Sequence, residues 1–266
     1  MSKLKQKWNK RVVLPFRQNK FLFEELVKRD FKRRYKGTVL GMLWSVIYPL
    51  LHLLVMRLVF TQFFGRNTPH YTTYLFCGIL IFHYFKESTH NGMSAILNNA
   101  NVLSKIRVPK YLFLLSKNVS CSINFAFTLV IFFIFAAFDH IQFRPAFFAL
   151  VYPIAFLIIF NIGVGMILSV LYVFFRDMSY LYDLFTLLLR YMSAIFYRVD
   201  SFPENVQGLF MINPVYCYIK YFRVVCVDGG FPTLNHHILC AAYAVGAVII
   251  GAIVYKKNNT RIMYYL

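Results

Sequence analysis

The chain has 266 residues, of which 59% are hydrophobic, 19% are aromatic and only 15% are charged. A soluble domain of this length cannot bury so much apolar surface, so the composition excludes a soluble globular protein and indicates an integral membrane protein. The net charge of +19 would favour nucleic-acid binding in a soluble chain, but 13 of the 29 Lys and Arg residues lie in the first 36 positions. This uneven placement indicates contact with anionic lipid headgroups and not with nucleic acid.

Residues 1–37 are predicted to form a basic cytoplasmic tail that ends in an amphipathic helix at 21–35. Phe23, Leu26 and Phe31 lie on one face of this helix, and charged side chains surround the other face. We expect the helix to lie in the cytoplasmic headgroup plane of the membrane. We expect no signal peptide, because a long basic segment precedes the first apolar run.

Six apolar segments follow, each long enough to cross a membrane. A hydrocarbon core of about 30 Å needs about 20 helical residues per crossing. Six crossings return both termini to one side, and the basic tail, the basic loop after the second segment and the basic residues of 256–266 place that side in the cytoplasm. The membrane domain is therefore predicted at 38–255, as an all-α domain with helices at 38–60, 71–90, 114–138, 147–175, 178–197 and 235–255.

The inner segment 91–110 is not an ordinary loop. Met93, Ile96 and Leu97 recur at helical spacing beside a polar face that contains Asn98 and Asn101. A short helix with an apolar stripe on the cytoplasmic side needs a partner. This partner is either the membrane domain of the same chain or another subunit.

The outer segment 198–232 is too long and too apolar for a simple loop. Asn213 and Pro214 form a typical helix start, and Gly229 and Gly230 form a typical stop. We predict one or two re-entrant or interfacial helices at the outer surface. One face of the predicted helix holds Val215, Tyr218, Ile219, Phe222, Val225 and Cys226, and the opposite face holds Tyr216, Lys220 and Arg223.

The sequence contains no catalytic constellation: a Walker A loop, a nucleophile elbow and an HExxH motif are all absent. We therefore expect no cofactor on this chain and no ATP hydrolysis by it, so that energy must come from a partner or an ion gradient. The five cysteines lack the spacing of a metal site and imply no disulfide framework, although a bridge between Cys217 and Cys226 stays open.

Several charged residues lie within the apolar segments. Arg57 and Arg190 either snorkel toward the outer interface or face a pathway and meet an anionic group there. Asp183 lies on the same helix face as Arg190, since the two are seven residues apart. Its carboxylate could pair with Arg176, with Lys86 or with a partner chain.

Small and aromatic residues complete the list of candidates. Gly163 and Gly165 are expected to allow close helix packing. Most of the 30 Phe, 19 Tyr and two Trp side chains must face lipid or fill the helix bundle. Tyr and Trp rings also stack on sugar faces, and an aromatic-lined channel would suit a polysaccharide; the candidates are Trp44, Tyr48, Tyr74, Tyr84, Tyr191 and Tyr197.

Five stretches carry a resemblance to a known family. They are RDFKRRYKGTVLGMLWSVIYPLL around the first span, YLFCGILIF in the second, NNANVLSKIRVPK in the inner segment, VFFRDMSYL between the fourth and fifth spans, and INPVYCYIKYFR in the outer segment. In this order, and over nearly its whole length, the chain resembles the type-2 ABC exporter permeases that move lipid-linked polysaccharides such as O-antigen, teichoic acid and capsule.

The resemblance implies a homodimer in the bacterial plasma (inner) membrane that binds two copies of a separate subunit, which carries ATP and Mg. It also implies a coupling helix in the inner segment and gate helices at 203–228. The residues expected in coupling are Met93, Ile96, Leu97, Asn98, Asn101, Leu103, Lys105 and Arg107. Those expected to receive the anionic lipid-linked end of the substrate are Lys28, Arg29, Lys32, Arg33 and Arg34. Those expected along the channel or gate are Trp44, Tyr48, Tyr84, Arg190, Tyr191, Tyr197, Lys220 and Arg223.

The chain departs from the family pattern at SAIFYRVD (193–200), where many relatives carry a TPIFYP-like sequence. It lacks both prolines and adds Arg198, so the exit gate is expected to differ. Other functions stay open: an ABC exporter of a drug or small lipid, an integral-membrane enzyme of glycan or lipid metabolism, and an ion-coupled carrier.

Overall fold

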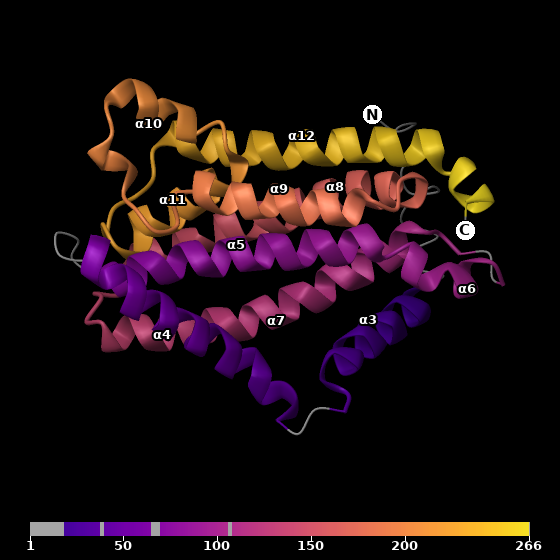
Figure 1. The fold of residues 1–266 in the computed structure, drawn as a ribbon, viewed down its shortest axis with the longest axis horizontal. Helices are drawn as coiled ribbons and strands as arrows, with labels where there is room; N and C mark the ends of the chain where they lie inside the picture. Colours follow the sequence, from indigo (N-terminus) through magenta and orange to yellow (C-terminus); the bar gives the residue numbers. More distant parts are fainter. Residues whose placement is uncertain (1–18, 38–39, 65–69, 106–107, 266) are drawn as a thin grey trace.

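The structure is a computed structural model of the chain and describes residues 19–37, 40–64, 70–105 and 108–265. Every regular element within these ranges is a helix, as predicted. In Figure 1 the long helices run side by side, with α10 and α11 at one end of the molecule and α6 and the C-terminus at the other. The α-helices are α3 (Lys20–Tyr35), α4 (Trp44–Phe64), α5 (Tyr71–Ser94), α6 (Ala100–Leu103), α7 (Tyr111–Phe138), α8 (Val151–Phe174), α9 (Met178–Met192), α10 (Glu204–Phe210), α11 (Pro214–Cys226) and α12 (Leu234–Asn258), and the 3-10 turns are η2 (Gly41–Leu43), η3 (Leu97–Asn99), η4 (Pro145–Leu150), η5 (Val199–Ser201) and η6 (Arg261–Tyr264).

Each of the six predicted spans coincides with one helix: α4, α5, α7, α8, α9 and α12. Of these, α7, α8 with the η4 turn before it, and α12 are long and apolar enough to cross a membrane. The fifth helix is shorter than predicted, because it ends at Met192 and not at residue 197. The chain turns just after it, at Ala194, whose φ of 47° lies in the left-handed region that a helix cannot use.

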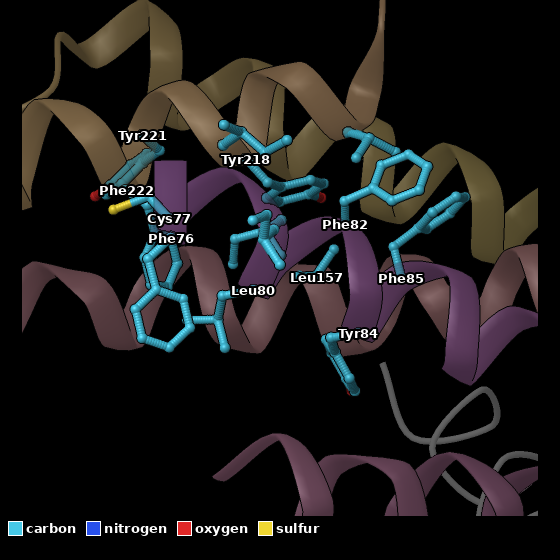
Figure 2. Close-up of a cluster of buried hydrophobic side chains, with 14 of the residues drawn as sticks. Phe76, Cys77, Leu80, Phe82, Tyr84, Phe85, Leu157, Tyr218, Tyr221 and Phe222 are labelled. Atoms are coloured by element: carbon cyan, nitrogen blue, oxygen red, sulfur yellow. The ribbon is translucent and has the colours of Figure 1, made fainter. Parts of the chain in front are cut away.

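The core lies between α5, α8 and α11. The side chains of α5 are buried on nearly all faces, from Tyr71 to Phe85, which is typical of a central helix that is apolar all round. Figure 2 shows Phe76, Leu80 and Phe85 of α5 packed with side chains of α8 and α11. Within the outer segment, α11 is therefore inserted into the core of the bundle, whereas the described side chains of α10 are exposed or half-buried.

Two close helix contacts depend on glycine. A Cβ atom on Gly163 of α8 would lie 2.5 Å from the carbonyl carbon of Ala247 on α12, and one on Gly251 would lie 2.6 Å from the Gly163 carbonyl oxygen. A Cβ on Gly92 of α5 would lie 3.2 Å from Cα of Gly165, whereas one on Gly165 would lie at an ordinary contact distance of 3.6 Å from Cα of Gly92. The close packing predicted for Gly163 is confirmed, and at the second contact the tight position is Gly92.

The predicted amphipathic helix is present as α3, which packs along α7 near the end that carries α6. Leu26 is the buried residue of its apolar face and belongs to a cluster with Ile96, Leu103 and Phe113. From α3 the next helix, α4, diverges from the bundle, and most of the apolar side chains that are described on it are exposed. A surface of this kind is stable in lipid or against another subunit.

Candidate functional site

The inner segment contains less α-helix than predicted. It consists of the last turn of α5, the 3-10 turn η3 and the single-turn helix α6. Met93, Ile96 and Leu103 are only 1%, 0% and 4% exposed. Ile96 and Leu103 pack with α3, α7 and α8, and Met93 packs with Leu168 and Tyr182. The apolar stripe therefore has its partner within the chain, and these three side chains cannot contact another subunit in the folded protein.

The outward face of the same segment is polar. Asn98, Asn101 and Lys105 are exposed, and Leu97 is half-buried. Arg107 lies outside the described residues. Any contact with a second subunit at this point must therefore be made mainly by amide and ammonium groups.

A buried carboxylate connects this segment to α3 and α7. Asp30 of α3 accepts hydrogen bonds from Arg29 at 2.9 Å and from Ser116 at 3.3 Å, and its Oδ1 lies 3.0 Å from Nζ of Lys117. Arg29 also donates to the Asn99 side-chain oxygen at 2.8 Å. Because a buried carboxylate is stable only when it is paired, this network fixes the inner segment, α3 and α7 relative to one another.

A basic pocket of about 200 Å³ lies beside this network, between α3, α5 and α7. It brings three cationic side chains together. Two of them are paired, Lys117 with Asp30 and Arg34 with Glu87, so Arg33 is the cation most available to an anionic ligand. Lys117 was missed in the sequence, although a lysine within an otherwise apolar segment is a signal for a special role. The lining residues are Asp30, Arg33, Arg34, Asn91, Lys117, Ser120 and Cys121.

The other predicted residues of the basic cluster lie outside the pocket. Lys28 donates to Glu25 at 2.9 Å, and the hydrogen bond and charge of Glu25 raise the pKa of Lys28. Arg29 is held by Asp30 and Asn99. Lys32 is exposed. The structure thus selects Arg33 and Arg34 from the five.

Arg34 forms an ion pair with Glu87 of α5. The Glu87 side chain is only 14% exposed, and its Oε2 accepts a hydrogen bond from Asn124 at 3.3 Å. Glu87 is therefore shielded from solvent, because Arg34 at the end of α3 covers it. By contrast, Nζ of Lys86 lies 3.3 Å from Oδ1 of Asp183 on α9. Lys86 was one of the partners predicted for Asp183.

Two small cavities of about 20 Å³ each, close to the volume of one water molecule, lie between α4, α5, α7 and α9. They share the side chains of Tyr48, His52 and His83. Arg190 lines the second cavity, with its guanidinium 5.5 Å from the ring centre of Phe82. Tyr48 and Arg190, two of the predicted channel residues, therefore line one cavity. Arg57 is exposed on α4.

The remaining aromatic candidates are dispersed. Tyr84 is buried, with its ring 4.3 Å from that of Phe125, so it is chiefly a core residue that borders the first cavity. Trp44 and Tyr191 are exposed. Tyr197 donates to the backbone oxygen of Tyr191 at 2.9 Å. Within the single chain these rings do not form a continuous path.

Arg223 is buried and holds the backbone of neighbouring elements in the single chain. It is 4% exposed and donates to the backbone oxygens of Ala194 and Ile195, each at 2.9 Å, and of Tyr74 at 3.3 Å. Its guanidinium also lies 3.5 Å from the centre of the Tyr74 ring. Lys220 on the same helix is half-buried. Neighbouring helices cover the face of α11 that carries Arg223, and the gate role expected for this residue stays a prediction.

A family model described as "ABC-2 type transporter" matches residues 22–227. The chain is 28% identical to the "O-antigen export system permease protein RfbA" of Klebsiella pneumoniae, over 91% of this chain and 94% of the relative. It is also 28% identical to a protein of the same name from Myxococcus xanthus, over 91% and 93% of the two chains. The "Polysialic acid transport protein KpsM" of Escherichia coli is 22% identical, over 92% and 96%.

Proposed function

Because the chain belongs to the ABC-2 type transporter family, we propose that it is the transmembrane subunit of an ATP-driven exporter that moves a lipid-linked polysaccharide across the bacterial plasma membrane. The observation that carries this proposal is the similarity to O-antigen and polysialic acid transport proteins along more than nine tenths of both chains. No large region of those relatives lacks a counterpart here.

The proposed assembly contains two copies of this chain and two copies of an ATP-binding subunit that holds ATP and Mg. Exposed apolar side chains on α4 and α9, such as Leu54, Leu184 and Leu188, support burial against lipid and against the second copy. Both termini are proposed to be cytoplasmic, with α6 and the exposed Asn98, Asn101 and Lys105 facing the ATP-binding subunit.

Substrate is proposed to enter from the inner leaflet at the basic pocket. Guanidinium and ammonium groups bind phosphate oxygens through charge-assisted hydrogen bonds, so Arg33, Arg34 and Lys117 suit the diphosphate of a lipid-linked glycan. Motion of the inner segment would reach this pocket through the Arg29–Asn99 hydrogen bond and the Asp30 network. The glycan would then pass Tyr48 and Arg190 between two copies of the chain.

Deleting the gene tests the transported substrate. We expect loss of the surface polysaccharide and accumulation of its lipid-linked precursor inside the cell, both reversed by the intact gene. Unchanged surface polysaccharide would instead favour a drug or small-lipid exporter.

An Arg33→Glu variant tests the basic pocket. Reversing this charge repels a diphosphate, so we expect surface polysaccharide to fall about tenfold, equivalent to about 1.4 kcal/mol of binding free energy, while co-purification with the ATP-binding subunit is retained. Lys32→Glu is the matched control, because it makes the same charge change on the same helix outside the pocket. Equal export by the two variants would remove the pocket from the substrate path.

A further inference from the structure

The helix α11 carries a cysteine near each of its ends, and each one meets a cysteine of another helix. Sγ of Cys217 lies 3.2 Å from Sγ of Cys240 on α12, and both side chains are fully buried. No covalent bond joins the two sulfur atoms. At this separation only a small movement is needed to reach the bond length of a disulfide, about 2.05 Å.

A second pair of buried cysteines lies near the other end of α11. Cys226 interacts with Cys77 of α5, and the sulfur of Cys77 is visible next to Phe222 in Figure 2. Cys217 and Cys226 themselves are nine residues apart on one helix, and hence about 13 Å apart along its axis. The bridge that the sequence left open between those two is therefore excluded, while each has a sulfur partner elsewhere.

A metal ion is the competing occupant at Cys217. His236 brings a third ligand atom, and those of Cys217, His236 and Cys240 lie within 4.8 Å of one another. However, Nε2 of His236 lies 2.9 Å from the backbone oxygen of Cys217 and forms a hydrogen bond there. A structural zinc site takes four protein ligands, and the described part of the chain groups only three at this point. The contact between the two sulfur atoms needs neither the imidazole nor a fourth ligand.

We propose that Cys217 and Cys240 form a disulfide that fixes α11 to α12. This rests on the proposed function, because it requires α11 to face the oxidising side of the membrane. The thiolate of one cysteine attacks the disulfide of a thiol–disulfide oxidant, and the second cysteine resolves the mixed disulfide. The pair gives up two electrons and two protons, and the oxidant leaves as a dithiol. Because the folded pair is buried, this step takes place before α11 packs.

The consequence is mechanical. With α11 covalently bound to α12, α11 cannot separate from the last helix when the exporter opens. Opening at the outer surface is then left to α9, α10 and the chain between them.

Counting thiols in the full-length protein tests the proposal. Membranes are dissolved in SDS with a chelator, and free cysteines are counted as gel shifts with a polyethylene-glycol maleimide, before and after reduction. In the natural protein, reduction should add at least two labelled cysteines. Cys240→Ser should raise the unreduced count by one, because Cys217 is released. Cys121→Ser is the matched control and should lower the count by one, since the Cys121 thiol contacts Asn91 and no described cysteine.

Five labelled cysteines without reductant would overturn the proposal, as would a count that falls by one in Cys240→Ser. A metal site would give this same result, because the chelator and SDS release its thiols. If Cys240→Ser is not recovered from membranes, mass spectrometry of the alkylated natural protein decides: peptides linked through Cys217 and Cys240 support the bridge, and both alkylated overturns it. The count does not depend on transport, so free thiols in a protein that still exports would leave the exporter standing.

Discussion

At the scale of single residues, Arg223 illustrates how a buried charge is kept. A cation removed from water is stable only when its donors are paired, and the three hydrogen bonds to Tyr74, Ala194 and Ile195 meet this need. The guanidinium passes over Gly78, where a Cβ would lie 2.9 Å from Nη2. The absence of a side chain at Gly78 in α5 thus leaves space for the side chain of Arg223, 145 positions further along the chain.

Replacing Arg223 by Ala should destabilise the protein strongly. The change leaves three buried carbonyl oxygens without their donor, and we expect a loss of roughly 3 kcal/mol in the free energy of unfolding, measured as a lower thermal unfolding midpoint in detergent. Lys220→Ala on the same helix is the control and should have little effect, because Lys220 is half-buried. Similar midpoints for the two variants would contradict the structural role of Arg223.

At the scale of elements, α11 shows why some boundaries follow from local sequence. The side chain of Asn213 accepts hydrogen bonds from the backbone nitrogens of Val215 and Tyr216, and Pro214 occupies the first helical position, where its missing N–H costs nothing. Gly229 has a φ of 66°, which the chain needs to turn back after the helix. Both boundaries were predicted because they depend only on neighbouring residues.

The inner segment gives an element-scale prediction with two different outcomes. Leu103→Asp places a charge in the cluster with Leu26 and Phe113, so we expect poor recovery of folded protein. Lys105→Glu changes an exposed side chain, so we expect normal unfolding behaviour but reduced co-purification with the ATP-binding subunit. Thermal unfolding and co-purification are measured on both variants. Full binding by Lys105→Glu would exclude this residue from the proposed interface.

At the scale of the whole molecule, the arrangement of α8 against α12 depends on glycines that remove the side chain at the contact. Gly163 and Gly251 let the two backbones approach more closely than any Cβ would permit, and small residues drive helix packing in membranes for this reason. The exposed apolar side chains of α4 and α9 lie elsewhere on the bundle. The chain thus presents a tightly packed unit together with helices that need lipid or a second copy.

Gly163→Ala tests this packing. The added Cβ would lie 2.5 Å from the Ala247 backbone, so α8 and α12 must move apart, and we expect a loss of about 2 kcal/mol in the free energy of unfolding. Gly246→Ala in α12 is the control, since nothing lies within 4 Å of its Cβ position. There the change should be neutral or slightly stabilising, because alanine favours the helix. Equal thermal midpoints would show that the close contact is not needed.

The sequence by itself determined the membrane class, the approximate places of the six helices and of α3, apart from the end of α9, and the start and end of α11. These features follow from composition, from hydrophobic periodicity and from capping residues, all of which act over a few neighbouring positions. Its resemblance to polysaccharide exporters likewise agreed with the family to which the chain belongs.

Only the tertiary structure decided which residues meet. It paired Arg34 with Glu87, added Lys117 to the basic pocket, buried Arg223 and placed Cys217 beside Cys240. The pattern along one helix fixes which residues share a face, but not the direction in which that face points in the bundle. That direction depends on contacts between helices far apart in the chain, as in the bond from Arg223 to Tyr74, 149 positions away.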